Sequence, residues 1–153
     1  MRIFPWQKKK EFFSEEEKQQ LVDAIQNAEK RTSGEIRLFI EPKCKYMDAL
    51  DRAKEIFFQF KMDKTDLRNA TLIYVAVKDH QTAVYGDEGI HQKVGQQYWN
   101  EVVSQMLNEF KQDHLVAGIC TAISALGEAL NNNFPYEKST DKNELPDEII
   151  FGS

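Results

Sequence analysis

Oxygen-bearing side chains of the kind that bind hard metal ions recur at three separate places in this sequence. The set comprises Glu35, Asp63, Asp66, Asn69, Asp87 and Glu88. Ca²⁺ and Mg²⁺ are bound in proteins by carboxylate, amide and backbone carbonyl oxygens. Gly86 and Gly89 flank the last two acids, and glycines let backbone carbonyls approach a ligand closely. If folding brings the three places together, these residues form a site for Ca²⁺ or Mg²⁺.

The same residues also allow an interpretation without a metal ion, because loop carboxylates are often solvated or cap helices. Carboxylates that are held close together repel one another unless a cation or a proton intervenes, so a true cluster binds metal or has raised pKa values. No EF-hand or other metal-binding motif is present to decide between the two interpretations. A second and weaker acidic set consists of Glu41, Asp48, Asp51 and Asp79. There, Asp48 is better explained as a helix cap.

Motifs for other kinds of chemistry are absent from the sequence. It has no nucleophile-elbow motif, no P-loop and no dinucleotide-binding glycine pattern. The three histidines, His80, His91 and His114, lack the i, i+4 spacing that would place two of them on one helix face. Cys44 and Cys120 are too few for a disulfide framework or a cysteine zinc site. The sequence therefore identifies no catalytic residue.

Short-range patterns predict the elements that must position the acidic residues. Ser14 and Glu17 form an S-x-x-E capping box that starts a helix over residues 14–31. Alternating apolar residues predict a strand over 35–41, and the apolar run 70–77 predicts a central strand covered on both faces. The remaining predicted elements are a helix from Asp48 to about residue 60, a strand over 82–85, a helix over 90–111 with a break at Gly95, and a helix over 115–132.

Loop lengths then predict the topology of the sheet. A helix separates the first two strands, so they form a parallel βαβ unit. Residues 78–81 are too few for a crossover helix, so the third strand must return antiparallel as a hairpin. Its carboxyl end then lies beside the amino ends of the other two strands. This arrangement would gather the three acidic places at one end of a small mixed sheet, in an α/β fold.

The ends of the chain differ from its centre. Residues 1–12 contain the basic run Lys8–Lys10 and predict a flexible N-terminal arm. Residues 135–153 have two prolines and little periodicity, which is typical of a C-terminal tail. The tail ends in an apolar stretch, 148–151, that could lie along a sheet edge or a groove. Residues 13–134 would then form a single domain.

Composition excludes several classes of function. Twenty basic and 25 acidic residues give a net charge of −5, which disfavours general nucleic-acid binding. No apolar run is long enough to span a membrane, and the first residues lack the apolar stretch of a secretory signal. We therefore expect a soluble, cytoplasmic protein.

Three strings of the sequence resemble the TPM domain, a family that includes thylakoid-lumen proteins of photosystem II repair. They are Ser33–Arg37 (SGEIR), Arg68–Ala76 (RNATLIYVA) and Tyr85–Ile90 (YGDEGI), and the resemblance extends over residues 13–134. It implies a three-layer α/β/α sandwich, with the small mixed sheet flanked by about four to five helices. An acid phosphatase activity has been ascribed to the family, and divalent-cation binding is associated with some members.

These observations predict a TPM-type protein that binds Ca²⁺ or Mg²⁺ and a protein partner, in the assembly or maintenance of a larger complex. Two alternatives stay open. One is a metal-dependent acid phosphatase acting on phosphomonoesters, in which a phosphorylated small molecule would be the substrate and Asp87 or Glu88 would handle a proton. The other is a metal-free structural adaptor whose acids are all helix caps.

Overall fold

The computed structural model describes residues 12–136 and 149–152. Within them lies a mixed four-stranded sheet in the order β3-β2-β1-β4. The strands are β1 (Glu35–Glu41), β2 (Ala70–Ala76), β3 (Gln81–Gly86) and β4 (Ile149–Phe151). β1 pairs parallel with β2 and with β4, whereas β2 pairs antiparallel with β3. The predicted parallel pair and the returning hairpin are both confirmed.

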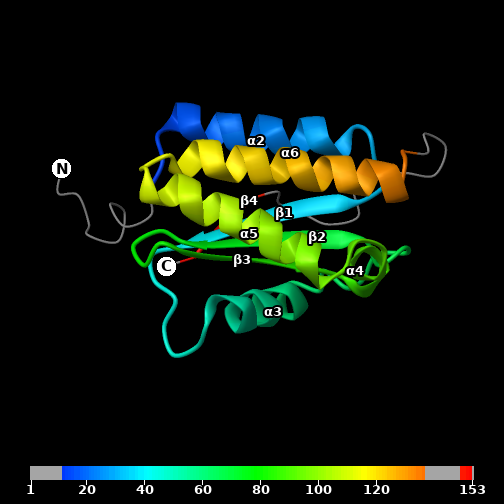
Figure 1. The fold of residues 1–153 in the computed structure, drawn as a ribbon, viewed down its shortest axis with the longest axis horizontal. Helices are drawn as coiled ribbons and strands as arrows, with labels where there is room; N and C mark the ends of the chain where they lie inside the picture. The colour runs from blue at the N-terminus through cyan, green and yellow to red at the C-terminus, as the bar shows by residue number, and fades with distance from the viewer. Residues whose placement is uncertain (1–11, 137–148, 153) are drawn as a thin grey trace, which may run out of the picture.

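Helices cover both faces of this sheet (Figure 1). On one face lie α2 (Glu15–Glu29), α5 (Gln96–Lys111) and α6 (Leu115–Asn133), and on the other face lies α3 (Ala49–Gln59). The short α4 (Glu88–Val94) follows β3 directly at one end of the sheet. This arrangement is the expected three-layer α/β/α sandwich. None of the helices that the structure describes is long and apolar enough to cross a membrane.

Local signals explain where the helices begin and end. The Ser14 hydroxyl accepts from the Glu17 amide at 3.1 Å and the Glu17 carboxylate accepts from the Ser14 amide at 2.9 Å, which is the predicted capping box. Asp48 caps α3 by accepting from the Asp51 amide at 2.8 Å. Gly95 has a φ of 81°, a conformation that favours glycine, and it separates α4 from α5 as predicted.

The hydrophobic core occupies both sides of the sheet. On the side of α2, α5 and α6 it includes Leu38 and Ile73, and on the side of α3 it includes Phe57 and Leu72. Every residue of β1 is buried, and so is every residue of β2. Burial of β2 follows from its apolar sequence, but β1 also carries charged residues into the interior. Those buried charges need partners, and the partners are supplied by other elements.

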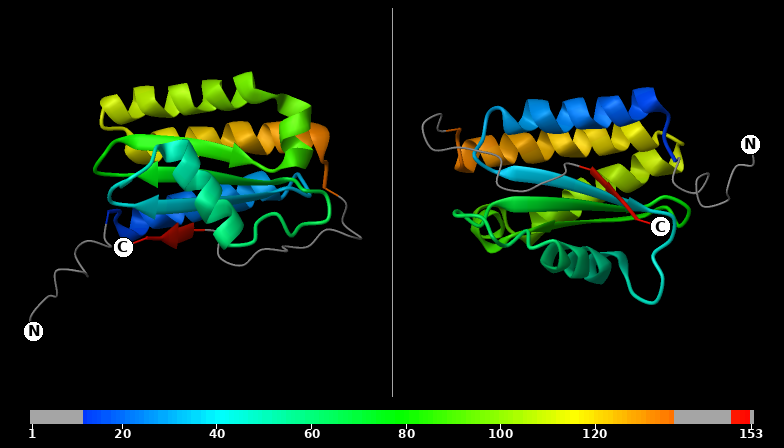
Figure 2. Two further views of the ribbon diagram at one scale, coloured as in Figure 1. Left: turned by 90° about the horizontal axis from the view of Figure 1, so that it is seen from below. Right: turned by 180° about the vertical axis from the view of Figure 1, so that it is seen from behind.

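The end of the chain returns to the sheet. β4 pairs with the free edge of β1, with Ile149 aligned to Leu38 and Phe151 to Ile40 (Figure 2). The prediction that the apolar end of the tail lies along a sheet edge is therefore confirmed. The flexible arm predicted for residues 1–12 lies outside the described residues apart from Phe12, which packs against the core. Residues 137–148 of the predicted tail are also outside them.

Candidate functional site

The amino ends of β1 and β2 meet the carboxyl end of β3 at one end of the sheet. Glu35 is aligned with Ala70 in the β1–β2 register, and the Asp87 amide donates to the Ala70 carbonyl at 2.9 Å. Glu35 and Asp87 therefore lie at the same end, on either side of Ala70. The topological prediction on which the acidic site depends is confirmed.

Arg68 binds two of the acids at this end of the sheet. Its Nε and Nη2 lie 2.6 and 2.8 Å from the two carboxylate oxygens of Asp87, and its Nη1 lies 3.3 Å from Glu88 Oε1. The hydrogen bonds that Arg68 donates to Asp87 raise the pKa of Arg68, and the charges of Asp87, Glu88 and Asp63 raise it further. Two of the predicted acids thus bind one guanidinium group, whereas Asp63 lies 3.7 Å from Lys64 Nζ.

Backbone geometry fixes this cluster. Asp87 is the N-cap of α4, and its carboxylate accepts from the Glu88 amide at 2.8 Å. The Gly89 amide donates to the Arg68 carbonyl at 2.8 Å. A Cβ on Gly89 would meet the carbonyl oxygens of Leu67 and Arg68 within 2.5 Å. The glycine therefore serves the close backbone approach that the sequence predicts, and it brings the Arg68 loop onto α4.

Glu35 is engaged with a different arginine. Its Oε1 lies 2.9 Å from Arg37 Nη2, and Arg37 Nη1 lies 2.9 Å from Glu29 Oε2. Arg37 is 1% exposed and Glu35 is equally interior. Burial raises the pKa of Glu29, while the Ile36 amide and Arg37 act in the opposite direction. Glu35 is thus part of a buried ion triad that joins α2 to β1.

The other predicted ligands occupy the loop before β2. The buried Asn69 amide donates to Ser33 Oγ at 3.3 Å, and Asp66 is exposed. Between Asp63 and Asp66, the hydroxyl of Thr65 is buried and has no hydrogen-bond partner among the residues that the structure describes. This loop therefore contains one polar group whose hydrogen bonds are not met by the described protein atoms.

The six predicted ligands are not a ready-made cation site. In the described ranges, no three histidine, cysteine, aspartate or glutamate side chains are placed to share one ion. The buried carboxylate of Asp87 is already bound by Arg68, whose side chain is 37% exposed. Arg68 is the residue that sequence reasoning missed. Its position in the same polar loop as Asp63 and Asp66 is the signal that could have revealed it.

The described residues do not identify a nucleophile that could catalyse hydrolysis. No serine, threonine or cysteine side chain in the described part of the chain is recorded in a hydrogen bond with a histidine, the pairing that activates a nucleophile. Hydrolysis of phosphomonoesters therefore stays a prediction from the family resemblance.

Comparison with known proteins decides the family. The model of the TPM domain matches residues 7–129. This chain belongs to the TPM-domain family. The TPM domain described here is similar to the BA42 protein of the psychrophilic bacterium Bizionia argentinensis, at 42% identity and a TM-score of 0.84, with 93% of this chain and 97% of that chain covered. No curated protein matches.

A second solved structure shares the fold alone. It is the N-terminal domain of the cg2496 protein of Corynebacterium glutamicum, which is 9% identical. The TM-score is 0.62, and the match covers 78% of this chain and 74% of that one. At this low identity, the likeness supports the α/β architecture of the TPM domain and says nothing about its ligands.

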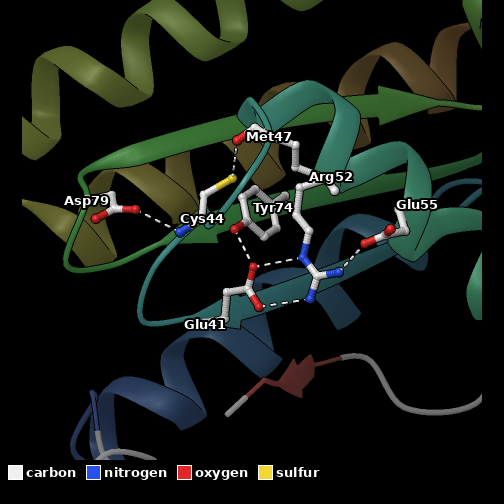
Figure 3. Close-up of polar contacts among 7 residues, drawn as sticks. All are labelled: Glu41, Cys44, Met47, Arg52, Glu55, Tyr74 and Asp79. Carbon is white, nitrogen blue, oxygen red and sulfur yellow. Dashed lines mark hydrogen bonds and ion pairs between the residues drawn. The ribbon is translucent and has the colours of Figure 1, made fainter.

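Glu41 and Asp79, two residues of the weaker acidic set, make hydrogen bonds and ion pairs at the opposite end of the sheet (Figure 3). Both carboxylate oxygens of Glu41 bind Arg52 at 2.9 Å, and Glu41 also accepts from the Tyr74 hydroxyl. Asp79 accepts from the Cys44 amide at 2.7 Å. The hydrogen bonds with Glu41 raise the pKa of Arg52. Glu41 and Asp79 of the TPM domain therefore make contacts that stabilise the fold, and Glu41 also lines a hollow of about 610 Å³.

The buried Tyr74 hydroxyl should make the free energy of unfolding fall at alkaline pH. Burial, and then the hydrogen bond to Glu41, raise the pKa of Tyr74 above its ordinary value. Above pH 10 the unfolded protein loses this proton and the folded protein keeps it, so the free energy of unfolding falls with pH. Tyr74 adds a slope of at most about 1.4 kcal/mol per pH unit.

Urea unfolding at pH 9 to 11 measures that slope. Tyr74→Phe should flatten it, and Tyr46→Phe, at a residue that is 98% exposed, should leave it unchanged. Equal alkaline slopes for Tyr74→Phe and the wild type would contradict the assignment.

Proposed function

We propose that this TPM domain is a binding module that takes up a divalent cation, Ca²⁺ or Mg²⁺, at the Arg68 end of the sheet, and that it acts with a protein partner. One observation carries the cation half of the proposal. The adjacent acids Asp87 and Glu88 bind a single partly exposed arginine, and the charge of Asp63, from the loop before β2, acts on the same arginine. Such an assembly of oxygens is the donor set that hard cations use.

Arg68 should weaken the binding of a cation, because it competes for the Asp87 carboxylate. The guanidinium neutralises Asp87 in the absence of any ion, so an incoming cation must compete with two short hydrogen bonds. Arg68 also has a φ of 52°, which is unusual for a residue other than glycine, so its loop is held in a less favourable conformation. Competition with Arg68 predicts weak binding, with a dissociation constant on the order of 1 mM.

Removal of Arg68 should therefore strengthen cation binding. In an amide-shift titration with Ca²⁺, we expect Arg68→Gln to bind about tenfold more tightly than the wild type, because the competing unit charge is lost. The shifts should centre on residues 63–69 and 86–89. Glu88→Gln should weaken binding with little risk to the fold, since Glu88 is largely exposed.

Arg52→Gln is the matched control, because it removes an arginine from the opposite end of the sheet. It should leave the Ca²⁺ affinity unchanged. Equal affinities for Arg68→Gln and the wild type, or shifts centred on Glu41, would refute the site. The absence of any shift at millimolar Ca²⁺ and Mg²⁺ in all variants would favour the metal-free adaptor.

A further inference from the structure

β3 is an edge strand with hydrogen-bonding groups directed away from the sheet. Among the described residues it pairs only with β2. The bond from the Asp87 amide to Ala70 shows which cross-strand pairs exchange hydrogen bonds, because such pairs alternate along antiparallel strands. Ala83 and Tyr85 therefore bond to β2. The amide and carbonyl groups of Thr82, Val84 and Gly86 point away from β2, at an edge where Thr82 and Val84 are only 6% and 3% exposed.

A groove runs along this open side. Two hollows of about 340 and 410 Å³ adjoin β3, and they share Leu50, Val84, Gln96 and Trp99, so they form one continuous channel. One wall comes from α3 and the other from α4 and α5, as Figure 1 shows with β3 between α5 and α3. A segment that paired along the whole of β3 would have about six residues, because β3 has six residues and a strand rises about 3.3 Å per residue.

The walls of the groove offer apolar contacts to such a segment. Phe58 and Leu50 of α3 are 49% and 38% exposed, although both side chains are large and apolar. Val103 and Leu107 of α5 line the other wall. Successive side chains of a bound strand point to opposite faces, so alternate residues would contact the two walls in turn.

Charge indicates the kind of segment that binds. Lys54 and Lys111 line the two hollows, and no ion pair is recorded for either within the described residues. Lys54 Nζ lies 6.0 Å from the centroid of the Tyr85 ring, at the floor of the groove. The acids of the groove, Asp87 and Glu88, are already paired with Arg68. The lining therefore carries three positive charges, on Lys54, Lys111 and Arg68, against two negative ones, and its net charge is +1.

We propose that this groove binds an extended acidic segment of a partner protein, which adds to β3 as a further strand. The opposite edge of the same sheet already accepts a short strand, β4. A second copy of the chain is a poorer occupant, because pairing of two β3 edges would bring the lysines of one groove toward those of the other. The proposal names the class of partner, and it does not depend on the cation site.

Hydrogen exchange tests the proposal at single amides. The probe is a blocked heptapeptide in which pairs of glutamates alternate with pairs of valines, so that glutamate faces both walls, and it is added in EDTA so that the result is independent of cation binding. The amides of Thr82 and Val84 should exchange at least about tenfold more slowly with the peptide, as expected for new strand hydrogen bonds. The amides of Ala83 and Tyr85 already bond to β2 and should change little.

Charge reversal supplies the matched comparison. The double variant Lys54→Glu with Lys111→Glu should bind the acidic peptide about tenfold more weakly, and Lys30→Glu, at the C-cap of α2, should bind it like the wild type. A heptapeptide with lysine in place of glutamate should protect neither amide in the wild type. Unchanged exchange of Thr82 and Val84 with the acidic peptide would overturn the proposal. So would concentration-dependent protection of these amides without peptide, which would assign the groove to a second copy.

Discussion

Replacing Arg37 with methionine should lower the free energy of unfolding by about 3–5 kcal/mol, the expected loss when one partner of a buried ion group is removed. Arg37 is almost completely buried and binds both Glu29 and Glu35 at 2.9 Å. Methionine fills similar space but leaves two carboxylates in the interior without their cation. We expect a fall in melting temperature on the order of 10 °C for a domain of this size.

The compensated variant distinguishes lost charge balance from lost packing. Arg37→Met combined with Glu29→Gln and Glu35→Gln removes all three charges, and much of the stability should return. Urea unfolding of the single and triple variants measures the difference. Arg31→Met, at an exposed residue just after α2, should change stability little. A triple variant as unstable as Arg37→Met would contradict the charge explanation.

Replacing Gly89 with alanine should destabilise the fold by about 1–3 kcal/mol, the usual range for forced overpacking. The added methyl group would collide with two backbone carbonyls, of Leu67 and Arg68, which cannot rotate away as a side chain could. The loop must then move off α4, and the ion pairs between Arg68 and Asp87 should weaken with it. The expected result is a lower melting temperature together with altered amide shifts in residues 67–69.

Gln92→Ala is the control for that substitution, because it adds no atoms at an exposed position of the same helix. It should preserve both the melting temperature and the shifts of the loop. If Gly89→Ala were as stable as Gln92→Ala, the close approach of the loop to α4 would not be the reason for a glycine at this position.

The elements of this protein follow from local patterns in its sequence. The capping box at Ser14, the alternation in β1 and the apolar run of β2 each act within a few residues, and each places its element within about two residues of the structure. The short turn before β3 is a covalent limit on chain reach, so the antiparallel hairpin and the meeting of Glu35 with Asp87 at one end could also be predicted.

Only the tertiary structure decided which charges meet. Asp87 reads as a metal ligand in the sequence, and its partner is Arg68, 19 residues earlier. Arg37 likewise binds Glu29 on another element, and the exposure of Phe58 depends on where α3 crosses the sheet. A carboxylate has the same sequence signature whether it faces an ion, an arginine or water. Its role depends on distances of a few ångströms between segments that are far apart along the chain.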